Sequence, residues 1–310
     1  VFVFGYNAVC SILKGLGDSK SPLYFVAVAT VSNIVLDLLL VGPFGMGTEG
    51  AACATIFSQG ISFVISVFHL KRTDFVFDFQ LSHFAVKTDK LAAILKIGLP
   101  TAAQMVVVNL SYLLITGMLN QFGVSVAAAS GVGLKINTFA GMPCWAIGQA
   151  VTAMAGQNIG AGDTIRVRKT TSTGLCLNLF ITLVMVLLVQ IFGKQLILLF
   201  TPASPEVLAE GIVYLRICCG VNSLVYAAMY TFDSFAIGTG AATIALFNAL
   251  LDAVIVRLPV SWLLAFPLGL GYPGIYIGQA LSPLLPAAAG LIYFKSKGWE
   301  NKRILHLHRA

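Results

Sequence analysis

Charged side chains are scarce in this sequence. Asp, Glu, Lys and Arg make up 10% of its 310 residues, whereas 58% are hydrophobic and the mean hydropathy is +0.90. Ordinary soluble domains carry about 25% charged residues. A soluble protein of this composition would have too little polar surface, so the composition excludes that class and predicts a polytopic membrane protein.

The sequence also lacks the features of a secretory leader. It has no initiator Met, and no basic segment with a cleavage site opens the chain. Residues 1–14 resemble the second half of a membrane helix that ends in a Lys-Gly turn. We therefore expect a chain whose first spans are missing.

Residue patterns typical of enzymes are missing as well. No Ser-His-Asp or Cys-His set lies at matched membrane depth, and the cysteines fall in apolar runs without metal-ligand spacing. We expect neither catalysis nor a cofactor, and no metal site beyond one for a coupling cation. The cysteines, which we interpret as packing residues, are Cys10, Cys53, Cys144, Cys176, Cys218 and Cys219.

What the sequence does contain is a series of long apolar runs. A membrane helix needs about 20 mainly apolar residues, and short polar or Gly/Pro-rich turns separate such runs along the chain. The pattern predicts an all-α membrane helix bundle with one partial span at 1–14 and about eight full spans. The full spans cover residues 22–42, 50–70, 97–119, 125–157, 172–193, 207–235, 242–266 and 272–294.

The longest break between spans, residues 71–96, is charged and mixed in character. We expect it to be a cytoplasmic linker between two lobes, residues 1–70 and residues 97–294. A basic tail then follows at 295–310.

Basic residues gather in alternate turns, while the opposite membrane face has Lys194 and almost no other base. Positively charged loops stay in the cytoplasm, so the asymmetry predicts a cytoplasmic C-terminus. It also explains the net charge of +7 without a nucleic-acid partner. The basic face carries Lys14, Lys20, Lys71, Arg72, Lys87, Lys90, Lys96, Arg166, Arg168, Lys169 and the tail residues from Lys295 onward.

Two glycine patterns recur along the chain. "ILKGLGDS" (12–19) matches "FAIGTGAA" (235–242), and "GMGTEGAACAT" (45–55) matches "GLGYPGIYIGQ" (269–279). The nearly constant offset indicates two similar lobes in the same orientation, as many transporters have. In this register Arg257 lies opposite Asn33 and Ser261 opposite Asp37, so the lobes differ chemically.

Two polar residues, Asn33 and Asp37, interrupt the span 22–42. They share a helix face because they are four residues apart, and a carboxylate in lipid costs several kcal/mol by most estimates. Oxygen ligands suit a hard cation such as Na+, and a buried carboxylate readily takes up a proton. The spacing favours a functional site, with an inert hydrogen bond between helices as the alternative.

Four segments in order resemble the multidrug and toxic compound extrusion (MATE) transporters. The resemblance covers nearly the whole chain and implies twelve helices in two lobes, of which this chain would supply the end of the fourth through the twelfth. It implies an antiporter in the bacterial inner membrane that exports drugs or toxic amphiphilic compounds in exchange for Na+ or H+, and we expect a monomer. The segments are "NAVCSILKGLGDSKSPLYF", "SNIVLDLLLVGPFGMGTEGAACATIFSQ", "KIGLPTAAQ" and "GQNIGAGD".

The resemblance also implies a cation site in the N-terminal lobe. Its residues here, matched by motif, are Asn33, Asp37, Thr55 and, less directly, Asn7. The family's acidic residue on the first helix has no assignable position in this sequence.

Further polar residues lie within the later spans. They are interpreted as lining a substrate cavity, with packing between helices as one alternative and, for Asp233, Asp252 and Arg257, a role in proton coupling as another. A contact between Asp252 and Arg257 is conceivable, although the i, i+5 spacing suits an α-helix poorly. The predicted cavity residues are Gln104, Asn109, Lys135, Asp233, Asp252 and Arg257.

Three other functions remain open. A lipid-linked precursor flippase of the same superfamily would need a more basic cavity, for which Lys135, Arg216 and Arg257 are the candidates. An intramembrane enzyme would need paired catalytic groups at one depth. A non-transporting membrane subunit would not require its polar residues to face one aqueous cavity.

Overall fold

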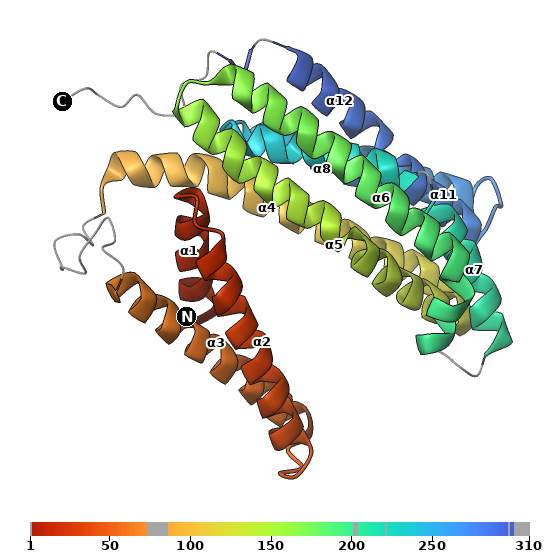
Figure 1. Cartoon of the computed structure of the whole chain (residues 1–310). Coiled ribbons are helices and arrows are strands. Elements are labelled where there is room, and N and C mark those ends of the chain that lie inside the picture. Colours follow the sequence, from red (N-terminus) through yellow and green to blue (C-terminus); the bar gives the residue numbers. More distant parts are fainter. Residues whose placement is uncertain (1, 73–85, 201–203, 221, 297, 301–310) are drawn as a thin grey trace. The chain divides into compact units, whose positions relative to one another are not determined.

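The computed structural model describes residues 2–72, 86–200, 204–220, 222–296 and 298–300, which are almost entirely helical and include no strand. The chain folds into two compact units, unit 1 (residues 1–87) and unit 2 (residues 88–310). Both are drawn in Figure 1. The predicted all-α bundle is therefore confirmed.

Unit 1 consists of three helices, α1 (Phe2–Gly15), α2 (Lys20–Val41) and α3 (Gly47–Arg72). The helices α2 and α3 run antiparallel, and the Ser62 hydroxyl donates across them to the Phe25 carbonyl at 2.8 Å. The buried side of α3 has small residues at every fourth position, which lets the two backbones approach closely. These residues are Gly50, Ala54, Ser58, Ser62 and Ser66.

The turn between α1 and α2 is held together by Asp18. Its Oδ2 accepts the Ser21 hydroxyl at 2.6 Å, and its Oδ1 accepts the backbone N–H groups of Lys20 and Ser21. The Ser21 hydroxyl also lies 3.0 Å from Nε2 of His69 near the end of α3. These hydrogen bonds, led by that from the Ser21 hydroxyl, lower the pKa of Asp18 because they favour its ionised form.

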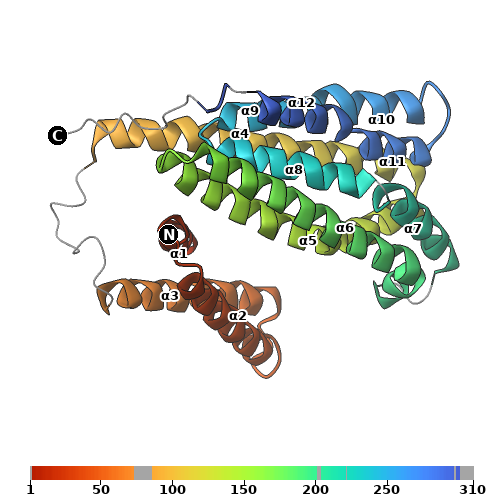
Figure 2. The same cartoon turned by 45° about the horizontal axis from the view of Figure 1, so that its top comes forward.

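Unit 2 contains the remaining helices. Helix α5 packs against α6, α7 and α8, while α4 packs against α9, as Figure 2 shows for the long helices. The elements are α4 (Thr88–Leu119), η2 (Asn120–Phe122), α5 (Val124–Gly160), α6 (Thr164–Phe200), α7 (Pro205–Cys218), α8 (Asn222–Gly238), α9 (Ala242–Leu250), η3 (Leu251–Arg257), α10 (Leu258–Ala265), α11 (Tyr272–Leu281) and α12 (Leu284–Lys295).

Two apolar clusters hold unit 2 together. One surrounds Tyr214 and Tyr276, whose rings meet edge to face with centroids 5.0 Å apart. The other surrounds Phe235 and the fully buried Trp299, with ring centroids 5.1 Å apart. The start of the predicted tail therefore packs against the helices, whereas residues 297 and 301–310 of that tail lie outside the described residues.

Each of the eight predicted full spans falls on helical segments of the structure. Six helical segments of the described residues are long and apolar enough to cross a membrane, or seven if α7 and α8 form one bent span. The predicted span 125–157 forms helix α5 but is not among the six, because its many glycine and polar residues reduce its hydropathy. The six segments are 20–41, 47–72, 88–122, 164–200, 242–265 and 272–295.

Two predicted boundaries also move. The span 207–235 is divided into α7 and α8, whose axes differ by 51°. Residues 88–96 of the predicted linker form the first turns of α4, because a helix can extend beyond lipid where its charged side chains remain exposed. Residues 73–85 of that linker lie outside the described part of the chain.

The segment η3 is a π-helix of seven residues between α9 and α10. A π-helix bonds residue i to residue i+5, and here the N–H of Leu258 donates to the carbonyl of Ala253. The wider turn brings residues five apart onto the same side of the helix. This local change determines which side chains meet inside unit 2.

Candidate functional site

In unit 1, Asn33 and Asp37 lie one turn apart on α2, and both are half-buried. The Asn33 Nδ2 and the Asp37 Oδ1 are shielded from solvent and have no hydrogen-bond partner within the described residues. Buried polar atoms are nearly always paired in folded proteins. Among the described residues, these two atoms therefore make no hydrogen bond to another helix.

The other two predicted cation ligands are exposed and bond to their own helices. The Thr55 hydroxyl donates to the Ala51 carbonyl at 3.0 Å, and the Asn7 Nδ2 donates to the Val3 carbonyl at 2.8 Å. Each still has an oxygen lone pair that could ligate a cation. The structure does not join these two residues to Asp37 by a hydrogen bond, so the four-residue cation site stays a prediction.

In unit 2, the structure brings together Gln104 and Asp233, which come from α4 and α8. The Gln104 Nε2 lies 3.4 Å from Asp233 Oδ2, and the Nδ2 of Asn248 on α9 donates to Asp233 Oδ1 at 2.6 Å. Asp233 and Asn248 are 3% and 1% exposed. The pair Asn248 and Asp252 repeats the spacing of Asn33 and Asp37, but the glycine register treats it as coincidental, so the sequence did not select Asn248.

A second polar cluster forms around Arg257. Its guanidinium pairs with Asp252 at 2.5 Å inside unit 2, where both residues are about 2% exposed. The contact that the sequence left open therefore forms, although its i, i+5 spacing suits an α-helix poorly. The reason is η3, because the π-helical turn places residues five apart side by side.

The remaining donors of Arg257 are also used. Its Nη1 donates to the Ser111 hydroxyl at 3.0 Å, and its Nε lies 3.4 Å from the Ser282 hydroxyl. The guanidinium carbon also lies 4.5 Å from the centroid of the Tyr112 ring, in the range of a cation–π contact. Arg257 thereby links η3 to α4 and to the segment between α11 and α12.

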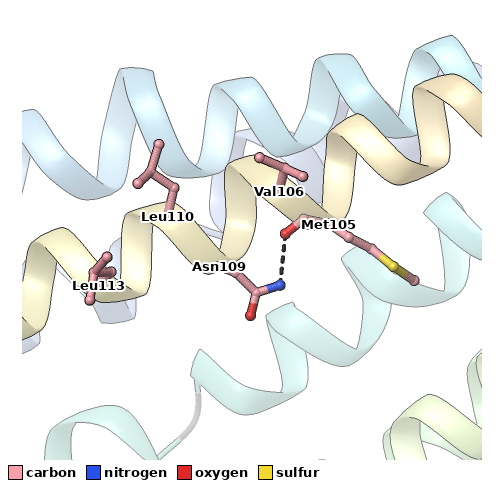
Figure 3. Close-up of a pocket in the computed structure, with 5 residues that line it drawn as sticks. All are labelled: Met105, Val106, Asn109, Leu110 and Leu113. Carbon is pink, nitrogen blue, oxygen red and sulfur yellow. Dashed lines mark hydrogen bonds between the residues drawn. The ribbon is translucent and has the colours of Figure 1, made fainter.

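Asn109 and Lys135 lie on the exposed surface of unit 2. Asn109 lines a shallow pocket of about 410 Å³ together with Met105, Val106, Leu110 and Leu113. Figure 3 shows its amide turned back toward the Met105 carbonyl, to which Nδ2 donates at 2.7 Å. The predicted cavity residues are thus divided between an open apolar surface and a closed interior.

The long apolar helices and the buried ion pair indicate the general class of this protein. Helices long and apolar enough to cross a bilayer, with ionisable side chains paired inside the bundle, are typical of multi-pass membrane transport proteins. The MatE family model matches residues 100–263, more than half of the chain, and the chain belongs to this family. The resemblance seen in the glycine-rich motifs is confirmed.

Individual relatives agree with this membership. The chain is 33% identical over 310 residues to the "Probable multidrug resistance protein YpnP" of Bacillus subtilis, covering 98% of this chain and 67% of the relative. It is 27% identical to the "Probable multidrug resistance protein NorM" of Thermotoga maritima, covering 99% and 67%. The chain therefore spans about two thirds of the length of these relatives.

Solved structures show the same fold. A MOP superfamily transporter from Pyrococcus furiosus matches with a TM-score of 0.88 at 20% identity, covering 93% of this chain and 65% of that one. At this identity the match concerns the fold alone.

Proposed function

We propose that this chain forms the larger part of a cation-coupled antiporter that exports drugs or other toxic amphiphilic compounds. Two relatives that match nearly the whole chain are named as multidrug resistance proteins, which supports this substrate class. Export against a gradient requires an energy source, and we propose an ion gradient, with Na+ and H+ as the candidates.

The observation that carries the proposal is the pair of unpartnered polar atoms on α2. Asp37 Oδ1 and Asn33 Nδ2 lie one turn apart, shielded from solvent and without a hydrogen-bond partner among the described residues. A carboxylate in a membrane helix is costly unless it has a partner. A bound Na+ or proton at Asp37 would provide that partner.

In this mechanism the transporter alternates between conformations open to either side of the membrane. The ion at Asp37 would favour one conformation and the exported compound the other. Each ligand must distinguish the two states, because equal affinity for both shifts nothing. Loss of the carboxylate would therefore uncouple the two equilibria.

The proposed location is the bacterial inner membrane, with a cytoplasmic C-terminus and a monomeric assembly. Relatives from Bacillus and Thermotoga support the bacterial membrane. The concentration of Lys and Arg in alternate turns supports the orientation.

A variant of Asp37 in the full-length transporter tests the function. We expect D37N to insert normally but to lose export of a fluorescent dye from cells. E49Q, which changes an exposed acid at the start of α3 in the same unit, should export as the wild type does. Imposing a Na+ gradient or a proton gradient separately in vesicles identifies the ion, and undiminished export by D37N would refute the proposal.

A flippase for lipid-linked precursors is less well supported. Such a protein needs free basic groups for an anionic headgroup. Of the candidate bases, Arg257 is buried and neutralised by Asp252, whereas Lys135 and Arg216 are exposed on separate helices. The charge distribution within unit 2 therefore favours export of less acidic compounds.

A further inference from the structure

Unit 2 buries two carboxylates, and their surroundings differ. Asp233 on α8 is 3% exposed and Asp252 on η3 is 2% exposed. Transfer of a charged carboxylate into such an interior is expensive unless the group is paired or neutralised. The two acids meet this requirement in different ways.

Asp252 is neutralised by a base. It accepts from the Arg257 guanidinium, whose other N–H groups reach Ser111 and Ser282. Asp252 and Arg257 together carry no net charge.

Asp233 forms no ion pair within the described residues. Its partners are two neutral amides, Asn248 Nδ2 at 2.6 Å and Gln104 Nε2 at 3.4 Å. Neither amide is charged, so the buried carboxylate finds no counter-charge among these partners. A buried acid without a counter-charge can avoid the free-energy cost of a buried charge by binding a proton.

Bases on neighbouring elements do not offer Asp233 a counter-charge. Arg257 on η3 is paired with Asp252, and Arg168 on α6 is paired with Glu300. Lys135 on α5 and Arg216 on α7 are exposed. The titratable tyrosines Tyr230 on α8, Tyr276 on α11 and Tyr293 on α12 are neutral at physiological pH.

The same cluster contains unused acceptors for a proton donor. The Oδ1 atoms of Asn248 and Asp252, one turn apart on α9 and η3, are buried and have no partner within the described residues. The two ends of an Asn amide exchange places by rotation, and the hydrogen-bond network selects the orientation. A protonated Asp233 could donate to the Asn248 oxygen, whereas an ionised Asp233 accepts from its nitrogen.

We propose that Asp233, together with Asn248, forms a proton-binding site inside unit 2 that is separate from Asp37 in unit 1. The proton binds a carboxylate oxygen of Asp233, and the Asn248 amide serves both protonation states. A proton fits better than a metal cation because it needs only one carboxylate oxygen and one acceptor, whereas a hard cation needs several oxygen ligands, and both amides here direct N–H groups at the carboxylate. The site does not depend on which compound is exported.

Infrared difference spectroscopy of the full-length transporter in lipid nanodiscs tests this site. We expect the C=O band of a protonated carboxylic acid to grow as pH falls in the wild type, and to be missing from D233N. The exposed acid Asp89 at the start of α4 supplies a matched control, since D89N should retain the band. D37N should also retain a band from Asp233, which separates this proposal from the proposed function.

A variant of Asn248 tests the geometry rather than the acid alone. N248L removes the hydrogen bonds of both protonation states, but the bond to the ionised carboxylate is the stronger because its acceptor is charged, so the midpoint of the band should move about one to two pH units upward. If D233N is poorly folded, D233E should still give a titrating band at a changed frequency. A band that survives in D233N, or a midpoint that is the same in N248L, would overturn the proposal.

Discussion

At the scale of single residues, the arrangement of buried charge in unit 2 depends on one arginine. Arg257 supplies the only counter-charge of Asp252 within the described residues, and it also contacts two serine hydroxyls and a tyrosine ring. Removing one partner of a buried ion pair leaves the other charge uncompensated, which is far more damaging than breaking an exposed pair.

This difference predicts the effect of two matched arginine variants. R257M should lower the free energy of unfolding by about 3–5 kcal/mol, measured by chemical denaturation in detergent. R166M, which breaks a mostly exposed pair with Asp163 at 3.9 Å, should cost less than about 1 kcal/mol. The double variant D252L/R257M should recover much of the loss because no charge remains buried. Equal effects of R257M and R166M would contradict this view.

The turn residue Asp18 predicts a pH-dependent contribution to stability. The pKa of Asp18 is lowered by its hydrogen bonds, so its contribution is present above the ordinary aspartate value of 3.8 and is lost as pH falls through the folded-state pKa. D18A should therefore be less stable than the wild type near neutral pH, and the difference should disappear in acid. Thermal unfolding at a series of pH values measures it.

A second variant isolates the cause of this effect. S21A removes the hydroxyl that donates to Asp18 Oδ2 at 2.6 Å. The pKa of Asp18 should then move back toward its ordinary value, and the pH-dependent part of the stability should shrink. An unchanged pH profile in S21A would show that the backbone donors alone hold the carboxylate.

At the scale of helices, close approach depends on glycines that face a neighbouring backbone. A Cβ atom at Gly278 on α11 would lie 2.6 Å from the Ser261 nitrogen and 2.7 Å from its Cα on α10. No flexible side chain can move aside at this contact, because the atoms belong to the backbone. The short distance between α10 and α11 therefore depends on the absence of a side chain at Gly278.

Alanine scanning of helix glycines should reveal this contact. G278A should destabilise the fold by about 1–3 kcal/mol through overpacking. G117A on α4 is the matched control, since a Cβ there meets no atom within 4 Å, and its higher helix propensity should leave stability unchanged or slightly raised. Thermal unfolding of both variants gives the comparison, and a G278A protein as stable as G117A would rule out the tight contact.

Helix positions were predictable from the sequence because apolar runs of about 20 residues have few alternatives in a membrane. Local departures from the α-helix could not be predicted from the sequence. The π-helical turn at Leu251–Arg257 leaves no periodic trace because the other five residues of the segment are all apolar, and it alone decides that Asp252 meets Arg257. The division of 207–235 was missed for the same reason, since hydropathy does not register a change of axis.

At the scale of the whole chain, family and fold class followed from the order of several glycine-rich motifs, and both are confirmed. The candidate sites were only partly predictable. Asp233 and Gln104 were selected individually as polar residues in apolar spans, but their meeting with Asn248 depends on α4 lying beside α8 and α9, and 129 residues separate Gln104 from Asp233. Contacts of that kind arise from packing, which a single sequence does not encode in any local pattern.

The aromatic cluster around Trp299 has a practical consequence for anyone who manipulates the C-terminus. The Trp299 indole is fully buried against Phe235, and its Nε1 donates to the Phe294 carbonyl at 3.1 Å, while Glu300 anchors to Arg168. Affinity tags or fluorescent fusions should therefore be attached after Glu300. A chain truncated directly after Lys295 would lack Trp299. Phe235, which lies two residues from Asp233, would then be exposed to water.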